Sequence, residues 1–533
     1  MAKKMPRVVY FCMEYGLESA FRIYAGGLGV LAGDVLKGAR DLRLPLIGVG
    51  ILWRQGYTKQ IIGTDGFPID VYPVYRYDFL KDTGIKVKVL IRGRQVICKV
   101  WLVDTLHNAA LYLLDTYLPE NEDPWITGQL YGWFSEERIA QEMILGIGGV
   151  RAIQALGIKP DIYHFNEGHA LFAGLELIRE QMAMHGRSFE EARDFVRRRI
   201  VFTTHTPIKE GNEKHDYSLL RYMGADSGLT YGQMLSLGGD PFNMTVGCLR
   251  LARIANGVSK LHGRTTKKMW ADVEDVPPII SITNGIHEPT WQNPAVKKAF
   301  HDNKPLRPIH LKAKETLLEF IRARTGRILD REKLLIGFGR RAAPYKRSSF
   351  IFRDMSVIGP LLKQGRLQLV FSGKGHPLDS EGKKIIAELI EISRSFPDRV
   401  VFLPDYDLET AKYMTQGCDV WLNNPIRPLE ASGTSGMKAA VNGVLNCSTL
   451  DGWWPEACIH GINGWQFGDG YEGPGQDQRD LAALYHILLK EVIPTYYHNG
   501  SKWEEMMKAS INTVSGKFSI GRMLNEYYQQ MYS

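Results

Sequence analysis

The segment Cys418-Asp-Val-Trp-Leu422 is a short apolar run, and Glu430-Ala-Ser-Gly-Thr-Ser-Gly-Met-Lys438 follows it as a glycine-broken loop. The pattern predicts a strand, a loop and a short helix opened by Met437. Backbone N–H groups of residues 433–436 can turn toward an anion, and the helix adds the positive end of its dipole. Lys438 is then expected in the first helical turn, beside the group that the loop holds. A solvated lysine after a flexible loop is the alternative interpretation.

The same strand-to-helix pattern recurs along the chain and decides the fold class. Short apolar runs bounded by Gly or Pro alternate with helical patterns, which indicates parallel βα units. The runs are Val8–Cys12, Leu46–Leu52, Ile162–Phe165, Ile200–Thr203 and Ile279–Ile282, then Leu334–Phe338, Leu367–Phe371, Val400–Leu403, Val420–Leu422 and Val444–Cys447. We therefore predict an α/β protein with two doubly wound, Rossmann-like domains facing a central cleft.

The domain prediction places the first domain at residues 1–326 and the second at 327–533. Alternating apolar and polar residues between Ile85 and Val103 predict a β-rich, antiparallel insertion around residues 70–105. Leu311–Thr325 is expected to be a helix, and the polar segment 326–333 after it is the candidate hinge. The last helix is expected to pack back on the first domain.

Composition excludes several classes of protein. The chain has 533 residues, 44% of them apolar and 23% charged, as in an ordinary globular protein. There is no apolar run of about 18 residues, so no membrane span is predicted. The net charge of +8 is too diffuse to indicate nucleic acid. The six cysteines lack CxxC spacing and are expected to be buried thiols of a cytoplasmic protein. The histidines lack HExxH spacing, so no metal site is predicted.

Unusual residues follow the predicted strands. His205, Asn284, the pair Arg340–Arg341, the segment Ser372–Lys374 and the Glu430 loop each come after a different apolar run. The carboxyl ends of parallel strands are where open α/β sheets bind ligands. These residues are therefore candidates for one binding site.

Two glycine loops and a group of cations indicate two neighbouring phosphates. Arg340, Arg341 and Lys346 lie within seven residues of each other, and such side chains suit phosphate contacts. The segment Gly26–Gly29 precedes a helical pattern and permits close backbone approach. A basic surface turn and a tight strand-to-helix turn are the alternatives. A lysine beside a phosphate-binding loop is what pyridoxal phosphate requires, with an imine to its aldehyde and a cradle for its phosphate.

The chain resembles the α-glucan (glycogen, starch and maltodextrin) phosphorylases. The Glu430–Lys438 loop resembles the family's cofactor-lysine motif. Seven further motifs occur in the family's order: Tyr24-Ala-Gly-Gly-Leu-Gly-Val-Leu-Ala-Gly33, Phe165-Asn-Glu-Gly-His169, Thr203-Thr-His-Thr-Pro207, Ala255-Asn-Gly-Val258, Thr283-Asn-Gly285, Arg340-Arg-Ala-Ala-Pro-Tyr-Lys346 and Thr449-Leu-Asp-Gly452. The resemblance implies the GT-B fold and pyridoxal 5′-phosphate as the cofactor.

The resemblance also implies roles for individual residues. The catalytic residues would be His205, Arg341, Lys346 and Lys438. The cofactor would be bound by Lys438, Arg340, Lys346, Thr434, Ser435 and Gly27. The substrate would be bound by Gly26, Gly27, Asn256, Tyr345, Glu430, Ser432 and Gly433. A role for Glu167 and His169 is expected but not assigned, and Tyr15 is left out because its motif is shifted by one position.

The implied activity is phosphorolysis of the terminal α-1,4 bond of an α-glucan or maltodextrin. Inorganic phosphate would be consumed and α-D-glucose 1-phosphate released with retention of configuration. Two alternatives remain, a sugar-nucleotide-dependent glucan synthase and a non-catalytic glucan-binding relative. The sequence leaves open the preferred chain length, the physiological direction, allosteric control and whether the protein forms a homodimer.

Overall fold

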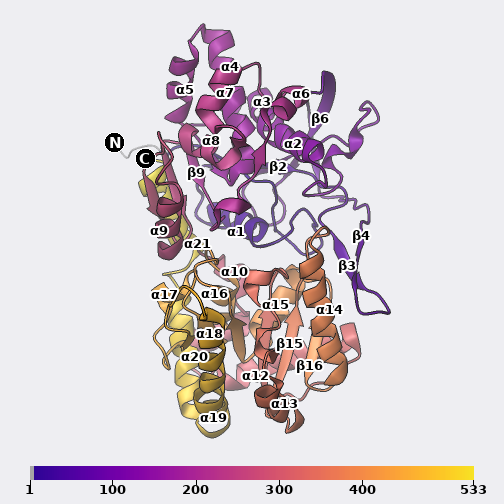
Figure 1. The fold of residues 1–533 in the computed structure, drawn as a ribbon, viewed down its shortest axis with the longest axis vertical. Helices are drawn as coiled ribbons and strands as arrows, with labels where there is room; N and C mark the ends of the chain where they lie inside the picture. The colour runs from indigo at the N-terminus through magenta and orange to yellow at the C-terminus, as the bar shows by residue number, and fades with distance from the viewer. Residues whose placement is uncertain (1–4) are drawn as a thin grey trace. The chain divides into compact units, whose positions relative to one another are not determined.

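The computed structural model describes residues 5–533, which divide into two compact units. Unit 1 comprises the chain up to Thr58, then Tyr72–Thr283 and Met523–Ser533. Unit 2 comprises Lys59–Val71 and Asn284–Arg522. Figure 1 traces both units by residue number.

Unit 1 is built on one large sheet. In the described chain this sheet has nine strands in the order β13-β12-β9-β8-β1-β2-β7-β6-β5. The strands are β13 (Ile279–Ser281), β12 (Ile254–Gly257), β9 (Ile200–Thr203), β8 (Ile162–Asn166), β1 (Val8–Phe11), β2 (Leu46–Ile51), β7 (Leu111–Asp115), β6 (Arg94–Val103) and β5 (Lys81–Ile91). The strands from β13 to β7 are parallel, because each connection returns through a helix or a long crossover.

The edge of this sheet carries the predicted antiparallel insertion. Strands β5 and β6 pair antiparallel, and β6 also pairs antiparallel with β7. The helices of unit 1 are α1 (Gly27–Asp41), α2 (Ser135–Met143), α3 (Gly149–Ala155), α4 (Leu171–His185), α5 (Phe189–Arg197), α6 (Tyr217–Met223), α7 (Tyr231–Gly238), α8 (Met244–Leu251) and α9 (Lys260–Met269). Short elements used below are the 3-10 turns η3 (Gly168–Ala170) and η4 (Lys209–Gly211) and the paired strands β10 (Lys214–His215) and β11 (Phe242–Asn243).

Unit 2 is built on a parallel sheet with the order β16-β15-β14-β17-β18-β19. Its strands are β14 (Leu334–Gly339), β15 (Leu367–Ser372), β16 (Val400–Leu403), β17 (Val420–Asn423), β18 (Leu445–Thr449) and β19 (Gly464–Phe467). The hairpin of β3 (Lys59–Ile62) and β4 (Pro68–Val71) also belongs to this unit. The predicted fold class, α/β with a largely parallel sheet in each half of the chain, is confirmed.

The sheet of unit 2 is buried on both faces. Leu334 and Ile336 belong to one apolar cluster, and Leu335 between them belongs to another, as the two-residue period of a strand requires. The helices are α10 (Glu288–Trp291), α11 (Pro294–His301), α12 (Arg307–Thr325), α13 (Met355–Lys363), α14 (Ser380–Ser395), α15 (Leu408–Gly417), α16 (Ser435–Ala440), α17 (Trp454–Ala457), α18 (Gln476–Ile487), α19 (Ile493–His498), α20 (Gly500–Val514) and α21 (Ile520–Glu526), which runs into unit 1.

The boundary between the units lies at Thr283 and Asn284, whereas the sequence placed it at residue 326. The reason is that α12 packs against α15, and Lys314 Nζ on α12 lies 2.6 Å from Asp419 Oδ2. The predicted hinge lies inside unit 2, where the Gln368 side chain hydrogen-bonds the backbone N and O of Asp330. The last residues belong to unit 1, and Tyr532 Oη lies 2.6 Å from His164 Nδ1.

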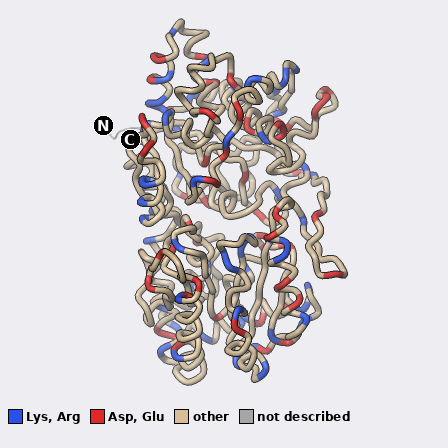
Figure 2. The backbone as a smooth tube through the Cα atoms, viewed as in Figure 1, with Lys and Arg blue, Asp and Glu red and all other residues tan. Residues whose placement is uncertain are grey.

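Thiols and charges follow the expectation from composition. All six cysteines are free, and all but the half-buried Cys458 are buried. Lys, Arg, Asp and Glu are interspersed along the chain (Figure 2). Between residues 5 and 533, no helix combines the length and the apolar character that crossing a membrane requires.

Candidate active site

The Lys438 loop has the strand, loop and helix that the sequence predicted. Strand β17 ends at Asn423, and α16 begins at Ser435, two residues before the predicted start, because Thr434 already has right-handed helical angles (φ −59°, ψ −14°). Lys438 is only 6% exposed, and its Nζ lies 4.0 Å from the centroid of the Trp291 ring. A buried amine against an aromatic face excludes the interpretation as a solvated lysine.

Glycines shape this loop for two different reasons. Gly433 has φ +80°, which other residues rarely adopt. At Gly436, a Cβ would lie 2.6 Å from Asn446 Oδ1 on β18, and Asn446 Nδ2 donates to the Gly436 carbonyl at 2.9 Å. Gly436 therefore allows α16 to sit directly on the sheet. The Ser435 hydroxyl accepts from Trp421 Nε1 at 3.2 Å.

The Glu430 carboxylate joins the two predicted cations. Its Oε2 accepts a hydrogen bond from Lys346 Nζ at 2.5 Å and another from Arg340 Nη2. All three side chains are nearly buried. Burial alone would raise the pKa of Glu430, but the charges of Arg340 and Lys346 and their hydrogen bonds outweigh it and lower the pKa to about 2. The structure therefore brings these three predicted residues into one charged group, which we call the Glu430 triad.

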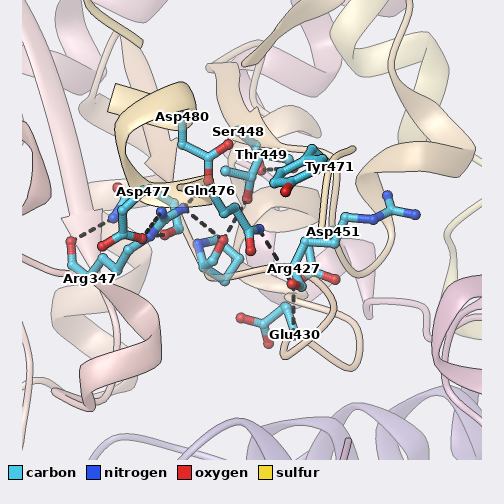
Figure 3. Close-up of polar contacts among 12 residues, drawn as sticks. Arg347, Arg427, Glu430, Ser448, Thr449, Asp451, Tyr471, Gln476, Asp477 and Asp480 are labelled. Carbon is cyan, nitrogen blue, oxygen red and sulfur yellow. Dashed lines mark hydrogen bonds and ion pairs between the residues drawn. The ribbon is translucent and has the colours of Figure 1, made fainter. Parts of the chain in front are cut away.

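A second carboxylate, that of Asp451, supports the loop through backbone hydrogen bonds. Asp451 Oδ2 accepts from the Glu430 backbone N–H at 2.8 Å, and Oδ1 accepts from Gly452 N–H at 2.8 Å. Figure 3 shows Asp451 beside Glu430 and Arg427. Burial and the neighbouring Glu430 charge raise the pKa of Asp451 to about 7. Its charge state therefore changes near neutral pH.

Two buried donors next to the triad have no protein partner. Among residues 5–533, no group hydrogen-bonds Arg340 Nη1 or Ser432 Oγ. The loop is close to this arginine, because a Cβ on Gly433 would lie 3.5 Å from Arg340 Nη2. Unpaired buried donors cost free energy unless a ligand satisfies them. A buried amine, a guanidinium and a hydroxyl beside one loop make a donor set that suits an anionic aldehyde.

Arg347 was missed by the sequence reasoning, and it holds the cation loop in place. Its guanidinium donates to the carbonyls of Asn424 (2.6 Å) and Pro425 (3.0 Å) and to the carboxylates of Asp477 (2.8 Å) and Asp480 (2.7 Å). Figure 3 shows this network. Its φ of +52° turns the chain directly after Lys346. The sequence offered no signal, since the partners lie far away in the chain.

The Asn424 side chain completes the support. Its Nδ2 donates to the carbonyls of Lys346 (3.0 Å) and Arg347 (2.6 Å).

Tyr345, in the 3-10 turn Pro344–Lys346, is half-buried, and its ring centroid lies 4.6 Å from Lys346 Nζ. Arg341 is exposed and lies in the loop after β14, next to the buried Arg340. Its expected contact with inorganic phosphate stays a prediction.

In unit 1, the Gly26–Gly27 loop caps helix α1 as predicted, with Gly26 as N-cap. The Glu14 carboxylate occupies part of this helix end, because its Oε2 accepts from the backbone N–H groups of Ala25 (2.5 Å) and Gly26 (3.0 Å). Its Oε1 accepts from Tyr131 Oη at 2.6 Å. The sequence missed Glu14, which takes the Gly26 donor that the prediction reserved for a ligand.

His205 is held at the end of β9 by two residues from the end of β8. Its Nε2 lies 2.7 Å from Asn166 Oδ1, and its backbone N–H donates to Glu167 Oε1. Glu167 has φ +74°, a strained conformation for a non-glycine residue that is often found at functional sites. Burial lowers the pKa of His205 to about 3. Its imidazole is therefore neutral at physiological pH.

One asparagine and one tyrosine side chain form their hydrogen bonds inside the protein core. Asn256 is fully buried, and its Oδ1 accepts from Thr203 Oγ1 at 2.6 Å. The structure does not bring its amide to a surface, and its contact with sugar stays a prediction. Tyr15 Oη donates within the core toward the carbonyls of Tyr10 (2.7 Å) and Val49 (3.1 Å), which agrees with leaving it out of the site.

These features define an α/β protein with two largely parallel sheets and a buried lysine beside a group of charged side chains. A family model for carbohydrate phosphorylases matches residues 287–457, which include Trp291, the Glu430 triad and Lys438. The chain is 40% identical to the maltodextrin phosphorylase of Thermococcus litoralis, over 99% of this chain and 70% of that protein. It is 37% identical to the glycogen phosphorylase of Aquifex aeolicus, over 99% and 86%. It is also 35% identical to an uncharacterised protein of Methanocaldococcus jannaschii, over 99% and 100%. The chain belongs to the carbohydrate phosphorylase family.

Proposed function

We propose that the protein is an α-glucan phosphorylase, a glycosyltransferase that passes the terminal glucosyl unit of an α-1,4-glucan to inorganic phosphate. The C1–O4 bond of the glucan breaks, a bond from C1 to a phosphate oxygen forms, and O4 of the leaving glucan takes a proton from phosphate. The product is α-D-glucose 1-phosphate. The observation that carries the proposal is the identity of 37–40% with relatives named maltodextrin phosphorylase and glycogen phosphorylase along 99% of the chain.

Pyridoxal phosphate fits the donor set around Lys438. Lys438 would hold its aldehyde, and Thr434, Ser435 and Arg340 would contact its phosphate. The fit rests on the buried Lys438 amine and on the unpaired Ser432 Oγ and Arg340 Nη1. When bound, the cofactor supplies a phosphate group that exchanges a proton with inorganic phosphate.

The cations of unit 2 would bind the phosphate substrate. Arg341 offers a two-pronged guanidinium and Lys346 a point charge. Lys346 is pre-positioned, because Asn424 and the Arg347 network fix the turn that carries it. Glu430 forms ion pairs with both Arg340 and Lys346 and so neutralises part of their buried positive charge. A phosphate anion would share these cations with the carboxylate, so Glu430 would also moderate the affinity for phosphate.

His205 would act on the sugar as a neutral group. Because burial lowers its pKa to about 3, the imidazole adds no positive charge that would oppose the developing oxocarbenium ion. The hydrogen bond from Nε2 to Asn166 fixes the ring orientation. Tyr345, Ser432, Gly433, Asn256 and the Gly26–Gly27 loop are the remaining candidates for the sugar hydroxyls.

The two alternatives from the sequence are not favoured. A sugar-nucleotide-dependent synthase has no use for a lysine that holds an aldehyde, yet Lys438 is buried at the expected position. A non-catalytic relative would not need the paired Arg340 and Lys346. The free thiols fit a reducing compartment such as the cytoplasm.

The test is the release of glucose 1-phosphate from maltodextrins of graded length, with and without inorganic phosphate. We expect release that depends on phosphate and on chain length. Release of free glucose alone, or no release at any length, would refute the proposal.

A further inference from the structure

A group of ionisable side chains in unit 1 has no role in the proposed reaction. Glu142 lies on α2, His169 on η3, Glu213 directly before β10 and His215 on β10. One ligand atom from each of Glu142, His169 and Glu213 lies within 4.8 Å of the other two. His215 Nε2 lies 3.5 Å from Glu142 Oε2 and 3.5 Å from Glu213 Oε1. Three potential metal-binding side chains therefore converge, and the His215 imidazole contacts both carboxylates of this group.

Most of the converging atoms are buried and unsatisfied. Glu142 is 0% exposed and His215 is 6% exposed. Over the part of the chain that the structure describes, both oxygens of Glu142, His169 Nδ1 and His215 Nε2 have no hydrogen-bond partner. Buried polar atoms are nearly always paired, so a cluster of four unpaired ones needs a partner from outside the chain.

The spacing of these atoms fits a metal ion better than mutual hydrogen bonds. At 3.5 Å the His215 contacts are too long for good hydrogen bonds. A tetrahedral ion with bonds of about 2.1 Å holds its ligand atoms about 3.4 Å apart. The separations of His215 Nε2 from the two carboxylates, 3.5 Å each, match that value, and the ligand atoms of Glu142, His169 and Glu213 lie within 4.8 Å of one another.

The charge balance of this group is also compatible with a bound cation. Arg138 Nε lies 3.0 Å from Glu213 Oε1, and its Nη2 lies 3.2 Å from Oε2, whereas Glu142 Oε1 is 3.6 Å away. Arg138 thus neutralises the charge of Glu213 and orients its carboxylate, as the hydrogen-bond partners of metal ligands commonly do. Its ion pair with Glu142 is longer, and no hydrogen bond joins the two side chains, so the negative charge of Glu142 is less fully compensated than that of Glu213.

We propose that Glu142, His169, Glu213 and His215 bind one divalent transition-metal ion, with Zn²⁺ favoured by two imidazole and two carboxylate donors. The ion would tie the segment after β9, which carries His205 and ends at β10, to α2 and η3. The sequence predicted no metal site because only Glu213 and His215 are close in the chain. Their i, i+2 spacing places both on one face of a strand.

The experiment uses the full chain, stripped with a chelator and titrated with Zn²⁺ by calorimetry and with Co²⁺ by visible absorption. We expect one equivalent of Zn²⁺ and the intense visible bands of tetrahedral Co²⁺. His215→Gln should weaken Zn²⁺ binding at least about a hundredfold, since even residues behind the ligands contribute 10- to 100-fold.

The matched control is His460→Gln. His460 and Glu491 form an exposed pair in unit 2, with Nε2 3.0 Å from the carboxylate, so this variant removes an ordinary surface His–Glu pair. It should leave the stoichiometry and affinity unchanged. Should His215→Gln fail to fold by circular dichroism, the near-isosteric Glu142→Gln gives the same comparison. No binding by the parent protein, or equal binding in the ligand variants and the control, would overturn the proposal.

Discussion

Replacing Glu430 by glutamine would separate two effects of its charge, the stabilisation of unit 2 and the competition with phosphate for Arg340 and Lys346. In the parent protein one carboxylate neutralises Arg340 and Lys346, whose side chains are nearly buried. Glu430→Gln keeps the shape of the side chain and removes only its charge. Two buried cations then face each other without an anion, so we expect unit 2 to lose stability and gain affinity for phosphate.

Two independent estimates give a similar magnitude for the loss in the free energy of unfolding. Removing one partner of a buried ion pair costs about 3–5 kcal/mol. Lowering the pKa of Glu430 from 4.5 to about 2 corresponds to about 3 kcal/mol of interaction with the ionised form. For a unit of about 150–250 residues, each kcal/mol shifts Tm by about 2–4 °C. We therefore expect Glu430→Gln to lower the Tm of unit 2 by about 6–20 °C.

The loss should depend on pH and on phosphate. Because the folded-state pKa of Glu430 is depressed, its stabilisation is present above about pH 4.5 and is lost as the pH falls toward 2. The gap in Tm between parent and variant should close over that range. At neutral pH, inorganic phosphate should raise the Tm of the variant more than that of the parent, since no carboxylate competes for the cations.

Differential scanning calorimetry measures both effects. The control is Glu472→Gln, which breaks the more exposed pair with Arg427 (2.9 Å) and should cost at most about 1 kcal/mol. Equal Tm values for the two variants, or a phosphate effect no larger than in the parent, would refute the account of the triad.

Four further predictions address the site. Lys438→Ala should abolish the near-ultraviolet absorption of the bound cofactor and nearly all activity, and a fully active variant without that absorption would exclude Lys438 as the attachment point. Borohydride reduction of the cofactor should spare much of the activity, because the proposed reaction uses the phosphate of the cofactor and not its imine; complete loss of turnover would count against this mechanism. Arg341→Ala should weaken the use of phosphate about ten- to a hundredfold, since a charge-assisted hydrogen bond contributes about 1.5–3 kcal/mol, while the cofactor spectrum stays unchanged; an unaltered KM for phosphate would contradict this role. Asp451 has a pKa raised to about 7, so the native state should lose stability as the pH rises from about 4 to 7, and Asp451→Asn should flatten this dependence, which urea titrations across the range can measure.

Strands were predictable because burial on both faces leaves an apolar run bounded by turn residues. Ile200–Thr203 and Val400–Leu403 were found with the bounds that the sequence suggested. Of the strands in the two large sheets, β7, β12 and β19 were missed, and β12 (Ile254–Gly257) shows why. Its polar Asn256 is paired inside the sheet with Thr203, so the run does not look apolar.

The candidate site was predictable where a few neighbouring residues carry the chemistry. The glycine loop and the buried Lys438 are local features, and the structure has them. The residues that position the loop could not be predicted from the sequence. Arg347 depends on Asp477 and Asp480, and Asp451 depends on the backbone of Glu430, contacts that only the folded sheet brings together.

The unit boundary was missed for the same reason. The polar segment 326–333 has the composition of a linker, but Asp330 is hydrogen-bonded to Gln368 on β15. Helix α12 before it is held by the Lys314–Asp419 ion pair. Composition indicates where a chain can be flexible, whereas tertiary contacts decide where it is divided.

The central claim is that the protein moves a glucosyl unit between a glucan and inorganic phosphate. Phosphorus-31 NMR of the protein with a maltodextrin and phosphate tests it most directly. The account predicts that the resonance of inorganic phosphate declines while that of α-D-glucose 1-phosphate grows, without its β anomer. A constant phosphate resonance under conditions in which a sugar nucleotide extends the same maltodextrin would contradict the account.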